Sequence, residues 1–131
     1  MKFMKCAGST NVGEVDNSIY GCIDNEGVAH LYFLAYDGVS HVELGKIDRF
    51  LEENETENFK PSNEMHIYDG IAVVYVQIDG KKYKAIITDS DTLGLYDEND
   101  EGELTDLPDS EVFYADELDN VPEEVVEYFC V

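Results

Sequence analysis

Positive charge is scarce in this chain and stops early: Lys84 is the last basic residue, and no lysine, arginine or histidine follows it. Residues 89–131 hold sixteen of the thirty acidic side chains, whereas residues 1–88 hold fourteen acids beside all eight lysines and arginines. Most of the net charge of −22 therefore lies in the last third of the chain. Such a surface repels nucleic acid and anionic lipid, so neither is expected as a direct partner.

Cysteine and long apolar runs are also scarce. The three cysteines, Cys6, Cys22 and Cys130, are an odd number without CxxC spacing, which argues against a disulfide framework and fits a reducing compartment. No apolar run approaches the ~20 residues that span a bilayer, and the first six residues lack the apolar core of a signal peptide. These absences predict a soluble cytoplasmic protein.

The motifs of common enzymes are missing as well. The chain contains no GxSxG, no GxxxxGK[ST] and no GxGxxG, and no cysteine stands beside a recognisable histidine partner. Thirty acids supply many carboxylate pairs, so no particular pair is singled out for acid–base chemistry. The sequence predicts a non-enzymatic protein without catalytic residues and without a cofactor.

Apolar residues, by contrast, are plentiful enough for folding. A hydrophobic content of 44%, with nine Tyr and six Phe, exceeds that of a disordered acidic chain. The length of 131 residues fits one domain. We expect a single domain over residues 1–131, with residues 1–88 as a hairpin-rich sheet core and residues 89–131 as a strongly acidic segment packed on it.

A strand meander is predicted near the start of the chain. Residues 18–24 and 28–36 are rich in β-forming side chains and are joined by the turn composition of residues 24–27. Asp37-Gly38 then predicts a type I′ turn into residues 39–44. The expected core face carries Leu31, Phe33, Ala35, Val42 and Leu44, and the opposite face carries His30, Tyr32, Tyr36, His41 and Glu43.

The same turn sets the distance between two histidines. It places His41 opposite Leu34 and His30 opposite Gly45. Four strand positions then separate the histidines by on the order of 13 Å, too far for both to bind one metal ion through bonds of ~2 Å. His66, the third histidine, stands apart. The sequence therefore predicts no metal site.

A second hairpin is predicted around Asp79-Gly80, between residues 71–78 and 81–88. Its register forms a core face that pairs Val76 with Tyr83 and Val74 with Ala85 and also takes Ile78 and Ile87. The opposite face, expected to be solvated, pairs Tyr75 with Lys84 and Gln77 with Lys82.

Two helices complete the expected fold. Residues 46–54 place Ile47, Phe50 and Leu51 at helical spacing. Pro122 suits the first position of a second helix, followed by acids at the positive end of its dipole and by a buried stripe of Val121, Val125, Val126 and Phe129. The predicted fold class is α+β: a small, mainly antiparallel sheet of about five or six strands, built from two hairpins, with one or two packing helices.

The acidic run that begins at residue 97 is the candidate binding surface. Dense carboxylates steer a basic partner into contact, and tyrosine, which is interleaved with these acids, is enriched at interfaces. The candidate partner-binding residues are Asp97, Glu98, Asp100, Glu101, Glu103, Asp106, Asp109, Glu111 and Asp116.

The start of this run also matches a calcium-binding loop. Residues 97–102 offer oxygen ligands at positions 1, 3 and 5 and glycine at position 6, but Pro108 stands where a bidentate glutamate is needed. We therefore expect no calcium site here.

These features predict an acidic inhibitor or interaction protein that binds a basic, nucleic-acid-binding surface of a partner by charge mimicry. Small phage anti-CRISPR and anti-restriction proteins act in this way as a class, and the chain is similar to them in size and charge. The expected partner is a nuclease, a toxin or another nucleic-acid-binding protein. Two alternatives remain: a cytoplasmic immunity protein or antitoxin that neutralises a basic toxin, and a small metabolite- or calcium-binding domain.

Overall fold

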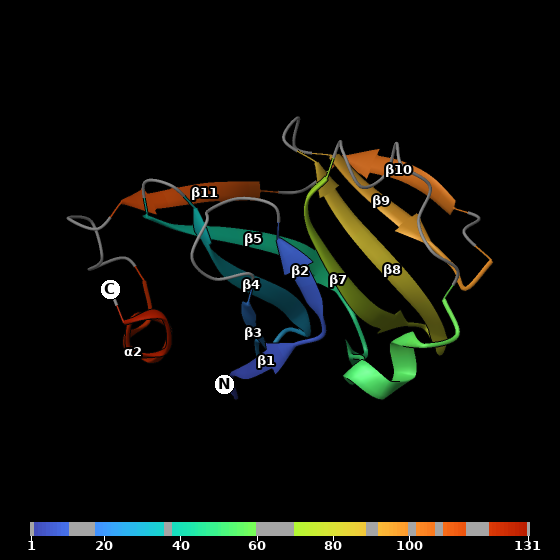
Figure 1. The fold of residues 1–131 in the computed structure, drawn as a ribbon, viewed down its shortest axis with the longest axis horizontal. Coiled ribbons are helices and arrows are strands. Elements are labelled where there is room, and N and C mark those ends of the chain that lie inside the picture. The colour runs from blue at the N-terminus through green and yellow to red at the C-terminus, as the bar shows by residue number, and fades with distance from the viewer. Residues whose placement is uncertain are drawn as a thin grey trace.

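The structure, a computed structural model, describes residues 2–10, 18–35, 38–59, 70–88, 92–99, 102–106, 109–114 and 121–130. These residues form two antiparallel sheets and one short α-helix (Figure 1). The fold is therefore mainly β. The expected α+β class, with one or two packing helices, is matched only in part, because the described residues are mostly antiparallel strand with one short α-helix.

Sheet A has five strands, in the order β1 (Met4–Cys6), β3 (Ile19–Ile23), β4 (Val28–Ala35), β5 (Gly38–Lys46) and β11 (Asp109–Tyr114). Sheet B has six strands, with β10 (Gly102–Asp106), β9 (Thr92–Tyr96), β8 (Lys81–Thr88), β7 (Gly70–Ile78) and β2 (Gly8–Thr10) in order, and β6 (Arg49–Phe50) also pairing with β7. The acidic last third thus supplies strands to both sheets.

The main core lies between the two sheets. Sheet A contributes Cys6, Ile19, Ala29, Leu31, Phe33, Val42 and Leu44, and sheet B contributes Phe50, Ala72, Val74, Val76, Ala85, Ile87 and Leu93. The predicted core face of the meander is confirmed for its four residues with described side chains, Leu31, Phe33, Val42 and Leu44. Apolar alternation along each strand produces this core, since residues two apart face the same side.

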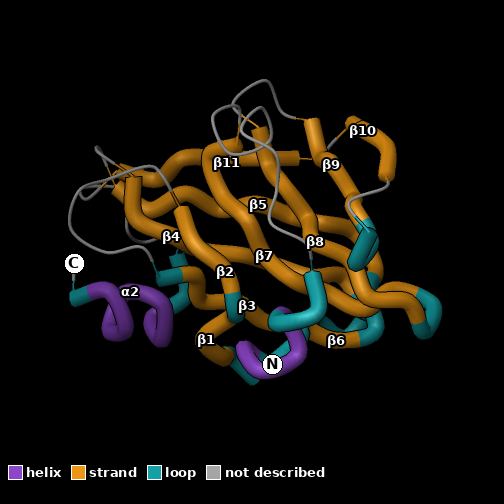
Figure 2. The backbone as a smooth tube through the Cα atoms, turned by 45° about the vertical axis from the view of Figure 1, so that its right-hand side comes forward, coloured by secondary structure: helices purple, strands orange, loops and turns teal. Residues whose placement is uncertain are grey.

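A second, smaller core forms where α2 (Glu123–Phe129) packs on the outer face of sheet A. It contains Tyr32, Val39, Val121, Val125 and Phe129. In both views α2 lies beside sheet A, away from β8 and β9 (Figures 1 and 2). The predicted C-terminal helix is confirmed, with Pro122 as its N-cap. Among the described residues no helix combines the length and apolar composition needed to cross a bilayer.

The other predicted helix, over residues 46–54, is wrong. This segment instead leads the chain from sheet A to sheet B: β5 runs to residue 46, β6 follows, and the Asp48 N–H donates to the Gln77 carbonyl at 2.7 Å. A short 3₁₀ turn, η1 (Glu53–Thr56), comes after it. The apolar residues that suggested a helical stripe, Ile47, Phe50 and Leu51, are buried, but from an extended linking segment.

The second hairpin has the predicted register, with Val76 opposite Tyr83 and Val74 opposite Ala85. Its turn residues Asp79 and Gly80 both have positive φ, 52° and 81°, as a type I′ turn requires. The expectation of a solvated opposite face is wrong at Lys84, whose exposure is 2%.

The first hairpin differs from its predicted register by two residues. Ala35 pairs with Gly38, Tyr32 with His41 and His30 with Glu43, whereas the Asp37-Gly38 turn predicted Leu34 opposite His41. Gly38 already belongs to β5, so the tight turn cannot include it. A two-residue slip leaves every side chain on its predicted face, which is why the hydrophobic pattern did not reveal it.

A β-bulge interrupts this hairpin beside His30. Ala29 pairs with Gly45 and His30 with Glu43, so Leu44 is an extra residue on β5. Gly45 has φ of +85°, the left-handed conformation that glycine adopts in a common type of bulge. The bulge sits directly next to the polar residues described below.

Candidate functional site

The predicted acidic run is distributed over the outer strands of both sheets. Glu103 and Asp106 belong to β10, the last strand of sheet B, and Asp109 and Glu111 belong to β11, the last strand of sheet A. Only two residues of sequence separate these strands. Within the described residues, these four acids therefore lie on one edge strand of each sheet.

Two further candidates, Asp97 and Glu98, directly follow β9. Asp97 accepts a hydrogen bond from the Asn99 N–H at 2.8 Å, and its other oxygen lies 3.7 Å from Lys81 Nζ. The Asp97 carboxylate therefore already has partners within the molecule. The neighbouring residue Glu98 is half-buried. Asp100, Glu101 and Asp116 lie outside the described residues, so the expectation of no calcium site stays a prediction.

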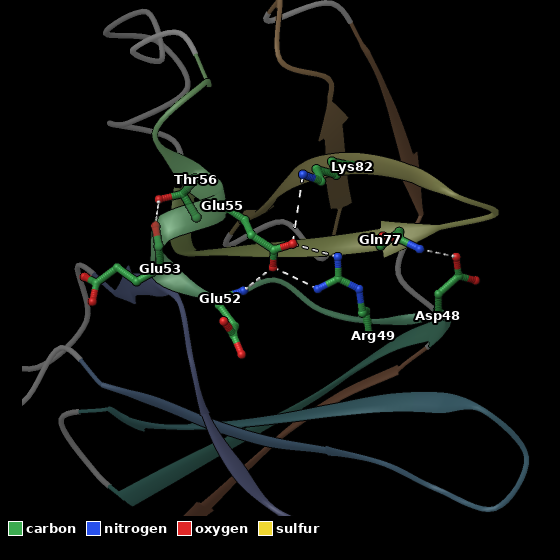
Figure 3. Close-up of polar contacts among 8 residues, drawn as sticks. All are labelled: Asp48, Arg49, Glu52, Glu53, Glu55, Thr56, Gln77 and Lys82. Carbon is green, nitrogen blue, oxygen red and sulfur yellow. Dashed lines mark hydrogen bonds and ion pairs between the residues drawn. The ribbon is translucent and has the colours of Figure 1, made fainter.

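Several of the few basic residues are already used in ion pairs. Arg49 holds the Glu55 carboxylate with two hydrogen bonds of 2.7 and 2.8 Å, and Lys82 lies 3.9 Å from the same carboxylate (Figure 3). The Glu52 N–H also donates to it at 2.7 Å. Hydrogen bonding from Arg49, then from the Glu52 backbone, lowers the pKa of Glu55 to about 2. These contacts neutralise charge locally, around Glu55.

A second polar cluster, which the sequence did not predict, lies on the outer face of sheet A. It consists of Asp24, His30, His41 and Glu43, from the end of β3 and from β4 and β5. The observed register places His30 of β4 opposite Glu43 of β5, and His41 lies two residues before Glu43 on β5. We call these four residues the histidine cluster.

The side chains of the histidine cluster are in direct contact. His30 Nδ1 lies 2.9 Å from His41 Nε2, and His30 Nε2 donates to Asp24 Oδ2 at 2.9 Å. Glu43 Oε1 is 3.8 Å from His30 Nδ1. The predicted separation of the histidines is therefore wrong, because it rested on the shifted register of the first hairpin.

The turn that follows β3 fixes Asp24 in place. Its Oδ1 accepts hydrogen bonds from the N–H groups of Glu26, at 2.8 Å, and Val28, at 3.0 Å, while Oδ2 faces His30. Hydrogen bonding from His30, then from the Val28 backbone, lowers the pKa of Asp24. A carboxylate can only accept hydrogen bonds, so this contact keeps a proton on Nε2 of His30.

His41 is fixed by aromatic packing. Its ring stacks on Tyr32 with a centroid distance of 4.5 Å and an interplanar angle of 4°. Burial, and then the nearby His30, lower the pKa of His41 to about 4. His41 is consequently neutral at physiological pH. The 2.9 Å contact between the rings joins Nδ1 of His30 to Nε2 of His41, and one of these two nitrogens donates the hydrogen bond.

This arrangement holds two imidazoles and a carboxylate with their potential ligand atoms close together. One nitrogen or oxygen from each of His30, His41 and Glu43 lies within 4.8 Å of the other two. Neutral imidazole and carboxylate are common ligands of transition metals.

Comparison of this chain with protein-family models, curated proteins and solved structures gives no match.

Proposed function

We propose that this protein is a non-enzymatic interaction protein that binds a basic, nucleic-acid-binding surface of a partner protein by presenting carboxylates where phosphates would bind. The observation that carries this proposal is the position of the acidic run. It contains no basic residue, and its described strands form the outer strand of each sheet. Among the described strands, an outer strand has no strand partner along one side, so a partner can approach the two strands that carry these acids.

The charge density of the run supports a phosphate-like role. Residues 97–111 contain eight acids in fifteen residues, or one charge per ~6 Å of extended strand. One strand of DNA carries a charge per ~3.4 Å, so the run has about half that density. To compete with DNA, the protein therefore needs a partner whose basic groove also contacts acidic residues outside the run.

Competition with duplex DNA for a basic DNA-binding domain tests the proposal. We expect the protein to displace fluorescently labelled DNA from a panel of sequence-nonspecific nuclease domains, with an affinity that falls steeply as salt rises. The charge reversals Glu98→Lys, Glu103→Lys and Glu111→Lys together should weaken displacement at least tenfold. Asp97 is left unchanged because it supports the turn.

The matched control reverses three exposed acids elsewhere, Glu53, Glu57 and Glu127, and so has the same net charge. We expect this control to displace DNA nearly as well as the parent protein. Equal weakening by both triple variants would show that only total charge matters, and failure of the parent against the whole panel would refute charge mimicry.

A further inference from the structure

The histidine cluster has the composition of a metal site. It lies beside the acidic run, because β11 pairs with β5 and places Asp109 opposite Glu43 and Glu111 opposite His41. His30, His41 and Glu43 lie on strands of sheet A, and Asp24 lies in the turn after β3. Their polar side-chain atoms contact one another at 2.9 to 3.8 Å. We propose that His30, His41 and Glu43 bind one transition-metal ion of the Zn²⁺ type, and that Asp24 positions His30 for this role. This inference is independent of the proposed function.

The ligand atoms lie close to the spacing of a metal site. In a tetrahedral site with bonds of ~2.0 Å, ligand atoms lie about 3.3 Å apart. His30 Nδ1 and His41 Nε2 are 2.9 Å apart, and His30 Nδ1 and Glu43 Oε1 are 3.8 Å apart. Shifts of about half an ångström bring both pairs to tetrahedral spacing. The remaining pair, His41 and Glu43, lies within 4.8 Å and closes by at most about 1.5 Å.

Asp24 gives His30 the orientation that a ligand needs. Histidine ligands commonly donate their other ring N–H to a carboxylate, which fixes the tautomer and makes the ligand nitrogen more basic. Asp24 accepts this hydrogen bond from His30 Nε2 at 2.9 Å, which directs the Nδ1 lone pair toward His41 and Glu43. The backbone hydrogen bonds of the β3–β4 turn hold Asp24 itself.

The ligand set selects the class of ion. Two imidazole nitrogens and one carboxylate suit Zn²⁺, Co²⁺ or Ni²⁺, whereas Ca²⁺ and Mg²⁺ prefer all-oxygen sites. The three ligands among the described residues leave the fourth tetrahedral position to water or to a further ligand. Solvent can reach the site, because 15% of the His30 side chain and 35% of the Glu43 side chain are exposed.

Binding also replaces the hydrogen bond between the two rings. The metal ion takes the Nδ1 lone pair of His30 and the Nε2 lone pair of His41, so each bound ring carries its single proton on its other nitrogen, Nε2 in His30 and Nδ1 in His41. The ring stack on Tyr32 is compatible with either tautomer, since it depends on the ring faces. Ring ¹⁵N chemical shifts of His41 report this change directly.

Calorimetry with Zn²⁺ on the untagged full chain tests the site. The background carries Cys130→Ser, because the exposed thiol of Cys130 is an alternative zinc ligand. We expect saturable binding of one ion. His41→Phe, which keeps a ring against Tyr32, should lower affinity at least 100-fold, and Asp24→Asn should lower it 10- to 100-fold. Mg²⁺ in large excess should not compete.

Glu43→Gln is compared with Glu53→Gln, which removes the same charge from an exposed residue outside the cluster. Affinity should fall at least tenfold in the first and stay unchanged in the second. Absence of one-site binding, equal affinity in His41→Phe and the parent, or equal loss in both glutamate variants would overturn the proposal. If His41→Phe fails to fold, zinc-induced ¹⁵N shifts at His30 and His41 of the parent decide, and shifts absent from both rings refute it.

Discussion

His41 lies between the ring of Tyr32 and a nitrogen of His30, and this position favours its neutral form. Its pKa is about 4 in the folded protein, below the ordinary value of ~6.5. Folding therefore disfavours protonation. The contribution of neutral His41 to the free energy of unfolding is complete above the pKa of the unfolded chain, and it is lost as pH falls from about 6.5 toward 4.

We predict that the His41 ring titrates well below pH 6.5 in a two-dimensional NMR titration of metal-free protein. Urea denaturation should show stability falling between pH 7 and pH 5, and His41→Phe should reduce that fall, because phenylalanine does not titrate. A His41 pKa at or above 6.5 would contradict the burial and contacts described here.

The same residue shows what the sequence could not reveal. The sequence predicts the correct strand and face for His30 and His41, but their separation depends on the register of one hairpin. Hydrophobic alternation has a period of two, so it cannot detect a slip of two residues. Gly38 pairs with Ala35 instead of forming the turn, and this single difference brings His30 and His41 into contact.

At the scale of elements, hairpins were predictable where the turn residues determine the backbone. Asp79 and Gly80 both adopt positive φ, and the register of the second hairpin followed from them. The helix expected over residues 46–54 failed because apolar residues at helical spacing also occur where an extended chain passes between two sheets. Local spacing alone does not distinguish these cases, and only the pairing of β6 with β7 does.

The bulge at Gly45 provides a prediction at this scale. Gly45 has φ of +85°, and a Cβ added there would meet no atom within 4 Å. A side chain at this position therefore clashes with no neighbouring residue. Its cost comes from the left-handed backbone, which destabilises the folded state by about 1–2 kcal/mol for an L-residue. Gly45→Ala should lower the free energy of unfolding by this amount in urea denaturation.

Gly45→Asn is the matched variant, because asparagine tolerates left-handed backbone better than alanine does. It should restore part of the stability that Gly45→Ala loses, while Lys46→Ala, an exposed neighbour, should change stability by less than ~0.5 kcal/mol. Equal and negligible effects of both Gly45 variants would mean that the bulge does not require this conformation.

At the scale of the whole molecule, the acidic third is part of the fold. It supplies β9 and β10 to sheet B, β11 to sheet A, and α2 to the outer face of sheet A. Its charge opposes compactness, but its apolar residues enter both cores. The apolar spacing in the sequence indicated the packing of α2, whereas the division of the acidic strands between two sheets depends on long-range pairing that local patterns do not encode.

We therefore predict that a fragment of residues 1–88 does not fold cooperatively. The deletion removes the buried side chains of Leu93, Val121, Val125 and Phe129, each worth ~1.5–3 kcal/mol on burial. Their sum of roughly 6–12 kcal/mol is comparable with the entire stability of a typical domain, about 5–15 kcal/mol. Relief of charge repulsion cannot compensate, because exposed charges are screened over ~8 Å at physiological salt.

Urea denaturation followed by circular dichroism, at physiological and high salt, measures this effect. A second fragment, residues 1–120, retains the segments of β9, β10 and β11 but lacks α2 and should show intermediate stability, since it loses only the core around Tyr32 and Val39. If the 1–88 fragment unfolds at the same urea concentration as the full chain, the acidic third is an independent appendage. If it regains cooperative unfolding at high salt alone, charge repulsion and not lost burial limits its stability.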